Sequence, residues 1–243
     1  MKEAVVIHLG TINGMVIVTI KRKKIKNVHL KVFRSLEVSL SVPEQITQEW
    51  IVNFLKEKTP WIDDQITKYK KSSGFNNLTK IHNGSSTQLL GKDMRIYKKA
   101  SQNNRIVIDA KRIILTLRDV HNDEVAQKMF NKWWRSTAKE IYQREVDKIF
   151  FSIFEKYEVK KPILVVKKMK TLWGSCSPLK GRITLNEYLL KADLRCIQYV
   201  VLHELTHLIY PNHSQKFYDF LTIQMPDWKE RKERLDTEVV QGL

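Results

Sequence analysis

Hydrophobic and polar residues alternate over residues 4–41, which is the pattern of strands that bury one face. Asn13-Gly14 falls between two of these runs and is a strong signal for a two-residue hairpin turn. Pro43 ends the pattern, because proline cannot donate a hydrogen bond to a sheet. The alternation therefore predicts an N-terminal β-meander.

The apolar period then changes to that of a helix. Thr47 is placed to cap a helix over about 48–70, in which Pro60 is expected to cause a break. A longer helical stretch is predicted from Asp123 to about Tyr157. Between the two helices, short alternating runs predict a small antiparallel sheet, at residues 86–90, 93–97, 105–109 and 112–117.

The last third of the chain mixes short strands with helices. Strands are expected at 162–167, 169–173 and 181–185. Helices are expected at about 194–210, 214–224 and 227–239, and the first has an apolar stripe.

Together these elements predict an α+β fold, in which an antiparallel β-rich N-terminal part precedes a helical C-terminal part. Residues 71–78, rich in Ser, Gly and Asn, give the best linker signal, and no internal repeat is evident. The expected domains are a basic meander with its helix at 1–75, the small sheet at 76–120 and a helical domain at 121–243.

Composition narrows the class of protein. With 42% hydrophobic and 28% charged residues in 243, the chain resembles an ordinary globular protein. Its two cysteines are too few for a secreted disulfide framework. No apolar run is long enough to span a membrane, and no signal peptide is evident, so we expect a cytoplasmic protein.

The formal net charge of +17 is concentrated in the first half of the chain. Its densest cluster consists of Lys21, Arg22, Lys23, Lys24 and Lys26. Such a cluster suits nucleic acid or another polyanion. A solvated strand in a lysine-rich protein is the alternative. The oligomeric state stays open.

A metal-binding pattern lies in the helix expected at 194–210. His203 and His207 are four residues apart and so share one helix face, with Glu204 beside them. Pro211 should end the helix and let His213 return as a third ligand. Three protein ligands indicate a catalytic Zn²⁺ site, with Glu204 as general base and acid toward a zinc-activated water. A core helix with hydrogen-bonded histidines is the alternative.

Further motifs surround this pattern: Trp173-Gly174-Ser175-Cys176-Ser177, Ile183-Thr184-Leu185-Asn186, His203-Glu204-Leu205-Thr206-His207-Leu208, Asn212-His213-Ser214 and Phe217. Their order resembles the YgjP-like family of zincin-type predicted metal-dependent hydrolases, which are related to SprT-like zinc metalloproteases. The resemblance implies a zincin-like catalytic domain, zinc bound by His203, His207 and His213, and Glu204 as catalytic acid and base.

Substrate contacts are expected from a second group of residues: Trp173, Ser175, Asn186, Tyr210 and Tyr218. The two tyrosines are candidate oxyanion donors. The first hypothesis for function is a cytoplasmic zinc metallopeptidase acting on peptides or proteins. The alternative is a zinc-dependent nucleoside triphosphate (UTP) pyrophosphatase, an activity that the resemblance also suggests, although no P-loop is present. A second alternative is a nucleic-acid-binding protein with a non-catalytic metal site.

Overall fold

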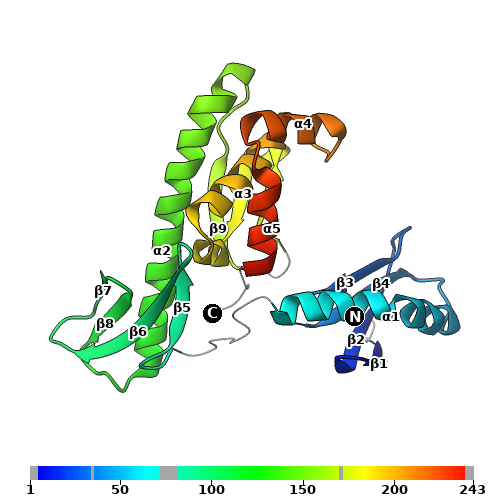
Figure 1. Ribbon diagram of the computed structural model, residues 1–243, viewed down its shortest axis with the longest axis horizontal. Helices are drawn as coiled ribbons and strands as arrows, with labels where there is room; N and C mark the ends of the chain where they lie inside the picture. The colour runs from blue at the N-terminus through cyan, green and yellow to red at the C-terminus, as the bar shows by residue number, and fades with distance from the viewer. Residues whose placement is uncertain (1–4, 34–35, 72–80, 170–171, 239–243) are drawn as a thin grey trace. The chain divides into compact units, whose positions relative to one another are not determined.

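A computed structural model describes residues 5–33, 36–71, 81–169 and 172–238 (Figure 1). The chain forms two compact units, Met1–Ser73 and Gly74–Leu243. The linker expected at 71–78 lies, apart from its first residue, outside the described residues. The division into domains at 1–75, 76–120 and 121–243 stays a prediction.

The first unit contains one four-stranded sheet and one helix. Its elements are β1 (Val5–Thr11), β2 (Gly14–Lys23), β3 (His29–Val32), β4 (Val38–Pro43) and α1 (Gln48–Lys71). The predicted hairpin is confirmed, and Gly14 has the positive φ of 101° that its turn requires. The strands do not form a meander, however. Two hairpins lie side by side in the order β1-β2-β4-β3, so that β2 and β4 run parallel.

Helix α1 covers one face of this sheet, and its side chains Ile51, Leu55, Ile62 and Ile66 share a core with the strands. Thr47 caps the helix as predicted, because its hydroxyl accepts from the Trp50 amide at 3.2 Å. The predicted break at Pro60 is wrong, since α1 continues through it. Pro60 is exposed, so water can reach the carbonyl that loses its helical partner there.

The second unit begins with the same arrangement of strands. Its first sheet contains β5 (Ser86–Leu89), β6 (Lys92–Ala100), β7 (Arg105–Asp109) and β8 (Arg112–Leu117), in the order β5-β6-β8-β7. The inner strands β6 and β8 are parallel, and α2 (Asp123–Ile149) follows β8 as α1 follows β4. The structure thus contains a repeat that the sequence did not reveal, because the two copies share their topology and not a visible residue pattern.

The remaining elements build the C-terminal part of the second unit. The predicted long helical stretch continues from α2 through a π-helical turn, Phe150–Phe154, to a short 3-10 helix, Glu155–Tyr157. It is followed by β9 (Ile163–Lys167), β10 (Gly174–Ser177), β11 (Arg182–Asn186), α3 (Leu194–Thr206), α4 (Gln215–Gln224) and α5 (Trp228–Glu238). The three strands form a sheet in the order β10-β11-β9, with β10 at an edge. The α+β class is confirmed.

One hydrophobic core extends through the second unit, from β5–β8 across α2 to the helices α3, α4 and α5. Helix α2 passes alongside both parts (Figure 1). The Trp134 indole donates to the Glu187 carbonyl at 2.9 Å, and the Tyr142 hydroxyl donates to the Asn186 carbonyl at 3.1 Å. These buried bonds hold the end of β11 against α2. No helix among the described residues is long and apolar enough to cross a membrane.

The β5–β6 hairpin packs against the segment that leads into α3. The Leu90 amide donates to the Leu190 carbonyl, and the Gly91 amide donates to the Lys191 carbonyl, each at 2.9 Å. A Cβ on Gly91 would lie 2.9 Å from the Cβ of Asp193, the N-cap of α3. Glycine is therefore needed for this close approach. The small sheet thus helps to position the start of α3.

Candidate metal centre and active site

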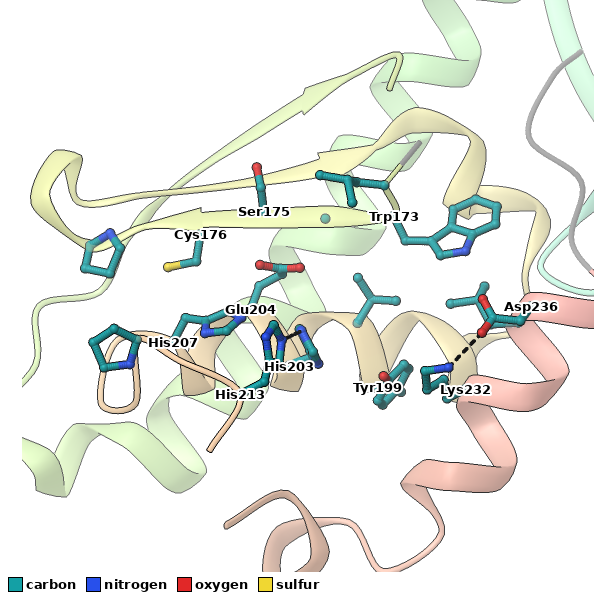
Figure 2. Close-up of a pocket in the computed structure, with 16 residues that line it drawn as sticks. Trp173, Ser175, Cys176, Tyr199, His203, Glu204, His207, His213, Lys232 and Asp236 are labelled. Carbon is teal, nitrogen blue, oxygen red and sulfur yellow. Dashed lines mark hydrogen bonds and ion pairs between the residues drawn. The ribbon is translucent and has the colours of Figure 1, made fainter. Parts of the chain in front are cut away.

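Three histidines converge at the C-terminal end of α3 (Figure 2). His203 lies in the last turn of the helix, His207 is its C-cap, and His213 returns from the following loop. One potential ligand atom from each histidine lies within 4.8 Å of the other two. The helix ends at Thr206, earlier than the predicted residue 210, because the amides of Leu208 and Ile209 donate to the carbonyls three residues before them, those of Leu205 and Thr206, and so tighten the last turn.

The separation of the imidazoles fits a metal ion. The Nε2 atoms of His203 and His213 are 3.0 Å apart. Two nitrogens bound to one tetrahedral zinc at about 2.0–2.1 Å lie roughly 3.3 Å from each other. A single hydrogen bond between two rings would explain that distance but not the approach of the third ring, His207. The side chains present therefore fit a divalent ion.

The protonation of the rings also suits ligation. His207 Nδ1 lies 3.1 Å from the Tyr210 carbonyl, so an Nδ1–H tautomer leaves Nε2 free to bind a metal. Burial, with smaller contributions from the other two imidazoles, lowers the pKa of His203 to about 3. Burial also lowers the pKa of His207. Both rings are therefore neutral near pH 7, which is the form that ligates metals. His203 Nδ1 is buried without a hydrogen-bond partner among the described residues.

Phe217 packs against all three imidazoles. Its side chain is fully buried, and its ring centroid lies 5.0 Å from that of His203, 4.8 Å from that of His207 and 4.7 Å from that of His213. The residue belongs to α4, which Ser214 precedes as its N-cap. A rigid aromatic ring behind the three ligands restricts their rotamers, so Phe217 helps to hold the site in shape.

Glu204 points toward β10, beside the three histidines (Figure 2). It is 5% exposed, and burial raises its pKa to about 8. Gly174 of β10 leaves the space that this carboxyl group occupies. A Cβ at position 174 would lie 2.6 Å from Glu204 Oε1 and 2.7 Å from its Cγ, closer than such atoms can approach. Glycine in the Trp173-Gly174-Ser175 motif is thereby explained by the packing of Glu204.

A groove of about 540 Å³ contains all four of these side chains. Its other walls are β10, through Gly174, Ser175 and Cys176, and the side chains of Tyr199 and Lys232. A neighbouring hollow of about 890 Å³ lies between α4 and α5 and shares His203, His213 and Tyr199 with the groove. Strand β10 pairs with β11 along one edge, and no strand of the described chain pairs with its other edge. The site therefore combines three histidines that could hold a metal ion, a buried carboxyl group and an open strand edge.

Two of the predicted substrate residues, Trp173 and Ser175, line the groove. Asn186 does not line it. Its buried side-chain amide donates to the carbonyls of Met169 at 2.8 Å and Leu172 at 2.9 Å, and its oxygen accepts from the amides of Met169 and Tyr188. This placement favours a structural role over the substrate contact predicted for Asn186. Of the strand predicted at 169–173, residues 170 and 171 lie outside the described residues, and Met169, Leu172 and Trp173 are not in a strand, since β10 begins only at Gly174.

The two predicted oxyanion donors lie apart from the groove lining. The Tyr210 ring packs 5.7 Å from the Phe220 ring, and Tyr210 lines neither the groove nor the hollow. Tyr218 lines the hollow, with its ring stacked 6.2 Å from that of His213. Tyr199 was not predicted from the sequence, and it lines both spaces. Its position four residues before His203, on the same helix face, could have revealed it.

The predicted polyanion-binding residues belong to the first unit and divide between two sides of its sheet. Lys21 and Lys23 alternate on the face of β2 opposite to the core, and Lys24 and Lys26 follow in the next loop, all exposed. Arg22 lies on the helix side, where its guanidinium donates to the carbonyls of Glu44, at 3.0 Å, and Ile46. Arg22 thus stabilises the turn before α1.

Comparisons with known proteins agree with the class that this site defines, a metal-dependent peptidase. A family model described as YgjP-like, metallopeptidase domain, matches residues 26–238. The chain therefore belongs to the YgjP-like family, as its motifs indicated. No curated protein matches the chain.

A solved structure, that of the metallopeptidase zymogen of Methanocaldococcus jannaschii jannalysin, is 24% identical over 39% of this chain and 92% of that chain. The TM-score between the two structures is 0.34.

Proposed function

We propose that this protein is a zinc-dependent metallopeptidase that cleaves extended peptide segments, with Glu204 as general base and acid. The single observation that carries the proposal is the placement of the Glu204 carboxyl group and the three imidazoles in one groove beside the open edge of β10. An extended peptide can pair its backbone with such an edge, and this would bring one peptide bond over the histidines.

The side chains divide the chemistry among them. A zinc ion held by His203, His207 and His213 would supply a Lewis acid that activates water and polarises the scissile carbonyl. Glu204 then accepts the proton of the attacking water and delivers it to the leaving amine, which keeps the proton balance closed. The Tyr210 carbonyl keeps His207 in one orientation during these steps. A positive charge held beside Glu204 favours its ionised form, against the effect of burial.

The charges of the groove favour a peptide over a nucleoside triphosphate. Lys232 is the only Lys or Arg among the described residues that line the groove, and it pairs with Asp236 at 2.9 Å. The hollow adds Lys229 but also Asp219 and Glu233. A triphosphate would need several unpaired cationic donors. Nucleotide hydrolysis is thus the weaker alternative. A non-catalytic metal site is disfavoured by the Glu204 carboxyl group in the same groove, since a structural ion needs no base beside it. The cytoplasmic location stays a prediction.

The test gives the zinc-loaded protein a peptide library and a panel of nucleoside triphosphates, with products identified by mass spectrometry. We expect peptide cleavage that falls by about 10²–10⁴-fold in Glu204→Gln, since general acid–base catalysis contributes that much. Zinc content should stay the same. The matched control is Glu140→Gln, an exposed glutamate of α2.

Undiminished cleavage by Glu204→Gln would exclude the role of Glu204. Pyrophosphate release that depends on Glu204, with all peptides left intact, would replace the peptidase by a nucleotide hydrolase.

A further inference from the structure

The groove holds a tyrosine that the proposed chemistry does not yet use. Tyr199 lies on α3, one turn before His203, and the two rings meet edge to face with centroids 5.9 Å apart. On its other side the Tyr199 ring stacks on Trp228 at 6.3 Å with an interplanar angle of 13°. The residue is 6% exposed, so its ring is held by packing on both sides.

The hydroxyl group of Tyr199 is available to a ligand. No described residue forms a hydrogen bond with it, and it is not among the fully buried polar atoms that lack a partner. It therefore keeps some exposed surface, and Tyr199 lines both the groove and the hollow. Figure 2 shows Tyr199 next to His203 and Lys232. A tyrosine hydroxyl is protonated at neutral pH, so it can donate.

Peptide hydrolysis requires such a donor. Water attack turns the scissile carbonyl into a tetrahedral species with a negatively charged oxygen, and hydrogen-bond donors aimed at that oxygen lower the barrier. Of the described tyrosines, Tyr199 alone lines the groove that contains Glu204. Because its ring is held between His203 and Trp228, the hydroxyl is oriented before the substrate arrives.

We propose that the Tyr199 hydroxyl donates a hydrogen bond to the carbonyl oxygen of the scissile peptide bond as negative charge develops on it. The assignment rests on the proposed peptidase function, and it makes Tyr199 a catalytic residue. No covalent bond to Tyr199 forms or breaks in this step, and its proton stays on the hydroxyl.

Tyr199→Phe tests the assignment, because it removes the hydroxyl and keeps the ring contacts. We expect kcat to fall by about 10²–10³-fold, as for other oxyanion donors, with KM, zinc affinity and melting temperature unchanged. Affinity for a phosphinic peptide, whose tetrahedral anionic group mimics the reacting carbon, should fall by a similar factor, while affinity for the product peptide should not. Tyr97→Phe, on β6 of the same unit, is the matched control.

The outcomes separate the two proposals. Equal kcat in Tyr199→Phe and the wild type would overturn the assignment and leave the peptidase function intact. A loss of kcat in Tyr218→Phe, with kcat unchanged in Tyr199→Phe, would also overturn the assignment. Reduced zinc affinity in Tyr199→Phe would show a structural role instead. If the wild type cleaves no peptide, the function itself is wrong, and the assignment fails with it.

An independent observation concerns the first unit, where the sheet face opposite α1 is basic. Lys21 and Lys23 of β2 and Lys31 of β3 project from this face, and register pairs place the half-buried hydroxyls of Thr19 and Ser41 between them, beside the buried Ser39. Strands β1 to β4 contain no Asp or Glu, although the exposed Glu37, directly before β4, lines a hollow together with Lys21 and Thr19. The three lysines are exposed, and none forms an ion pair with a described residue.

This face continues into apolar side chains. Ile17 and Met15 follow on β2, and Val6 lies on β1, with exposed fractions of 55%, 69% and 48%. Lysines and hydroxyls can bind phosphates, while exposed apolar side chains can contact base edges. We infer that this face binds single-stranded nucleic acid, with phosphates on the lysines and hydroxyls and bases toward Ile17 and Met15.

The test measures fluorescence anisotropy of a labelled oligo-dT of about fifteen nucleotides over a salt series. We expect the full chain to bind it, and the triple variant Lys21→Gln, Lys23→Gln and Lys31→Gln to bind more weakly. The slope of log affinity against log salt should fall by up to about 2, since each phosphate contact on a single strand contributes roughly 0.7. The matched control removes three exposed lysines of α2: Lys132, Lys139 and Lys148.

If both triple variants bind the oligonucleotide equally weakly, the effect reflects net charge alone, and the inference is overturned. Binding to vesicles of anionic lipid, without binding to the oligonucleotide, would assign the face to a membrane surface instead.

Discussion

At the scale of single residues, the site depends on the absence of a side chain at Gly174, which leaves space for the Glu204 carboxyl group. Gly174 has its backbone on β10, and the Glu204 carboxyl group occupies the space where a Cβ would be, 2.6 Å from Oε1 and 2.9 Å from Cδ. The glycine is not needed for an unusual backbone angle, since its φ is not positive. Its role is therefore steric.

Gly174→Ala should displace Glu204 without removing any of the proposed metal ligands. We expect peptide cleavage to fall by about 10²-fold, because a misplacement of about 1 Å has that effect on a catalytic group. Overpacking should lower the free energy of unfolding by about 1–3 kcal/mol. Zinc affinity, measured by competition with a chromophoric chelator, should change little. Gly10→Ala is the control, because a Cβ there meets nothing within 4 Å. Full activity in Gly174→Ala would show that Glu204 can move aside without consequence.

At the scale of elements, sequence patterns correctly predicted the structural features that are determined by residues close together in the sequence. The helix of His203, its spacing to His207 and the hairpin at Asn13-Gly14 all follow from contacts within a few residues. Pro60 was mispredicted. The usual effect of proline within a helix predicted a break, whereas at this exposed position water can replace the lost hydrogen bond.

Strand β10 shows why other elements could not be predicted. Its observed start at Gly174 depends on Asn186, which binds the carbonyls of Met169 and Leu172. No periodicity reveals that a side chain 14 or more residues away will take these backbone groups. The parallel pairing of β2 with β4, and of β6 with β8, is equally remote in sequence. The candidate ligands were predictable, whereas the groove around them depends on such long-range contacts.

At the scale of the whole molecule, the described residues form two separate hydrophobic cores. One belongs to β1–β4 and α1, and the other extends from β5 to α5 and includes the packing around the three histidines. Each core is large enough to support its own cooperative unfolding, so calorimetry should resolve two transitions. The proposed metal ligands all belong to the second unit.

Zinc should therefore raise the melting temperature of one transition only. A ligand at a hundred times its Kd stabilises the native state by about 2.7 kcal/mol, which for a unit of this size corresponds to a shift of roughly 5–10 °C. The melting temperature of the first unit should not change, because none of the three histidines belongs to that unit. His203→Ala should remove the shift, whereas His121→Ala, an exposed histidine before α2, should keep it. A zinc-dependent shift of both transitions, or one that survives His203→Ala, would show that the ion binds elsewhere or that the two units unfold together.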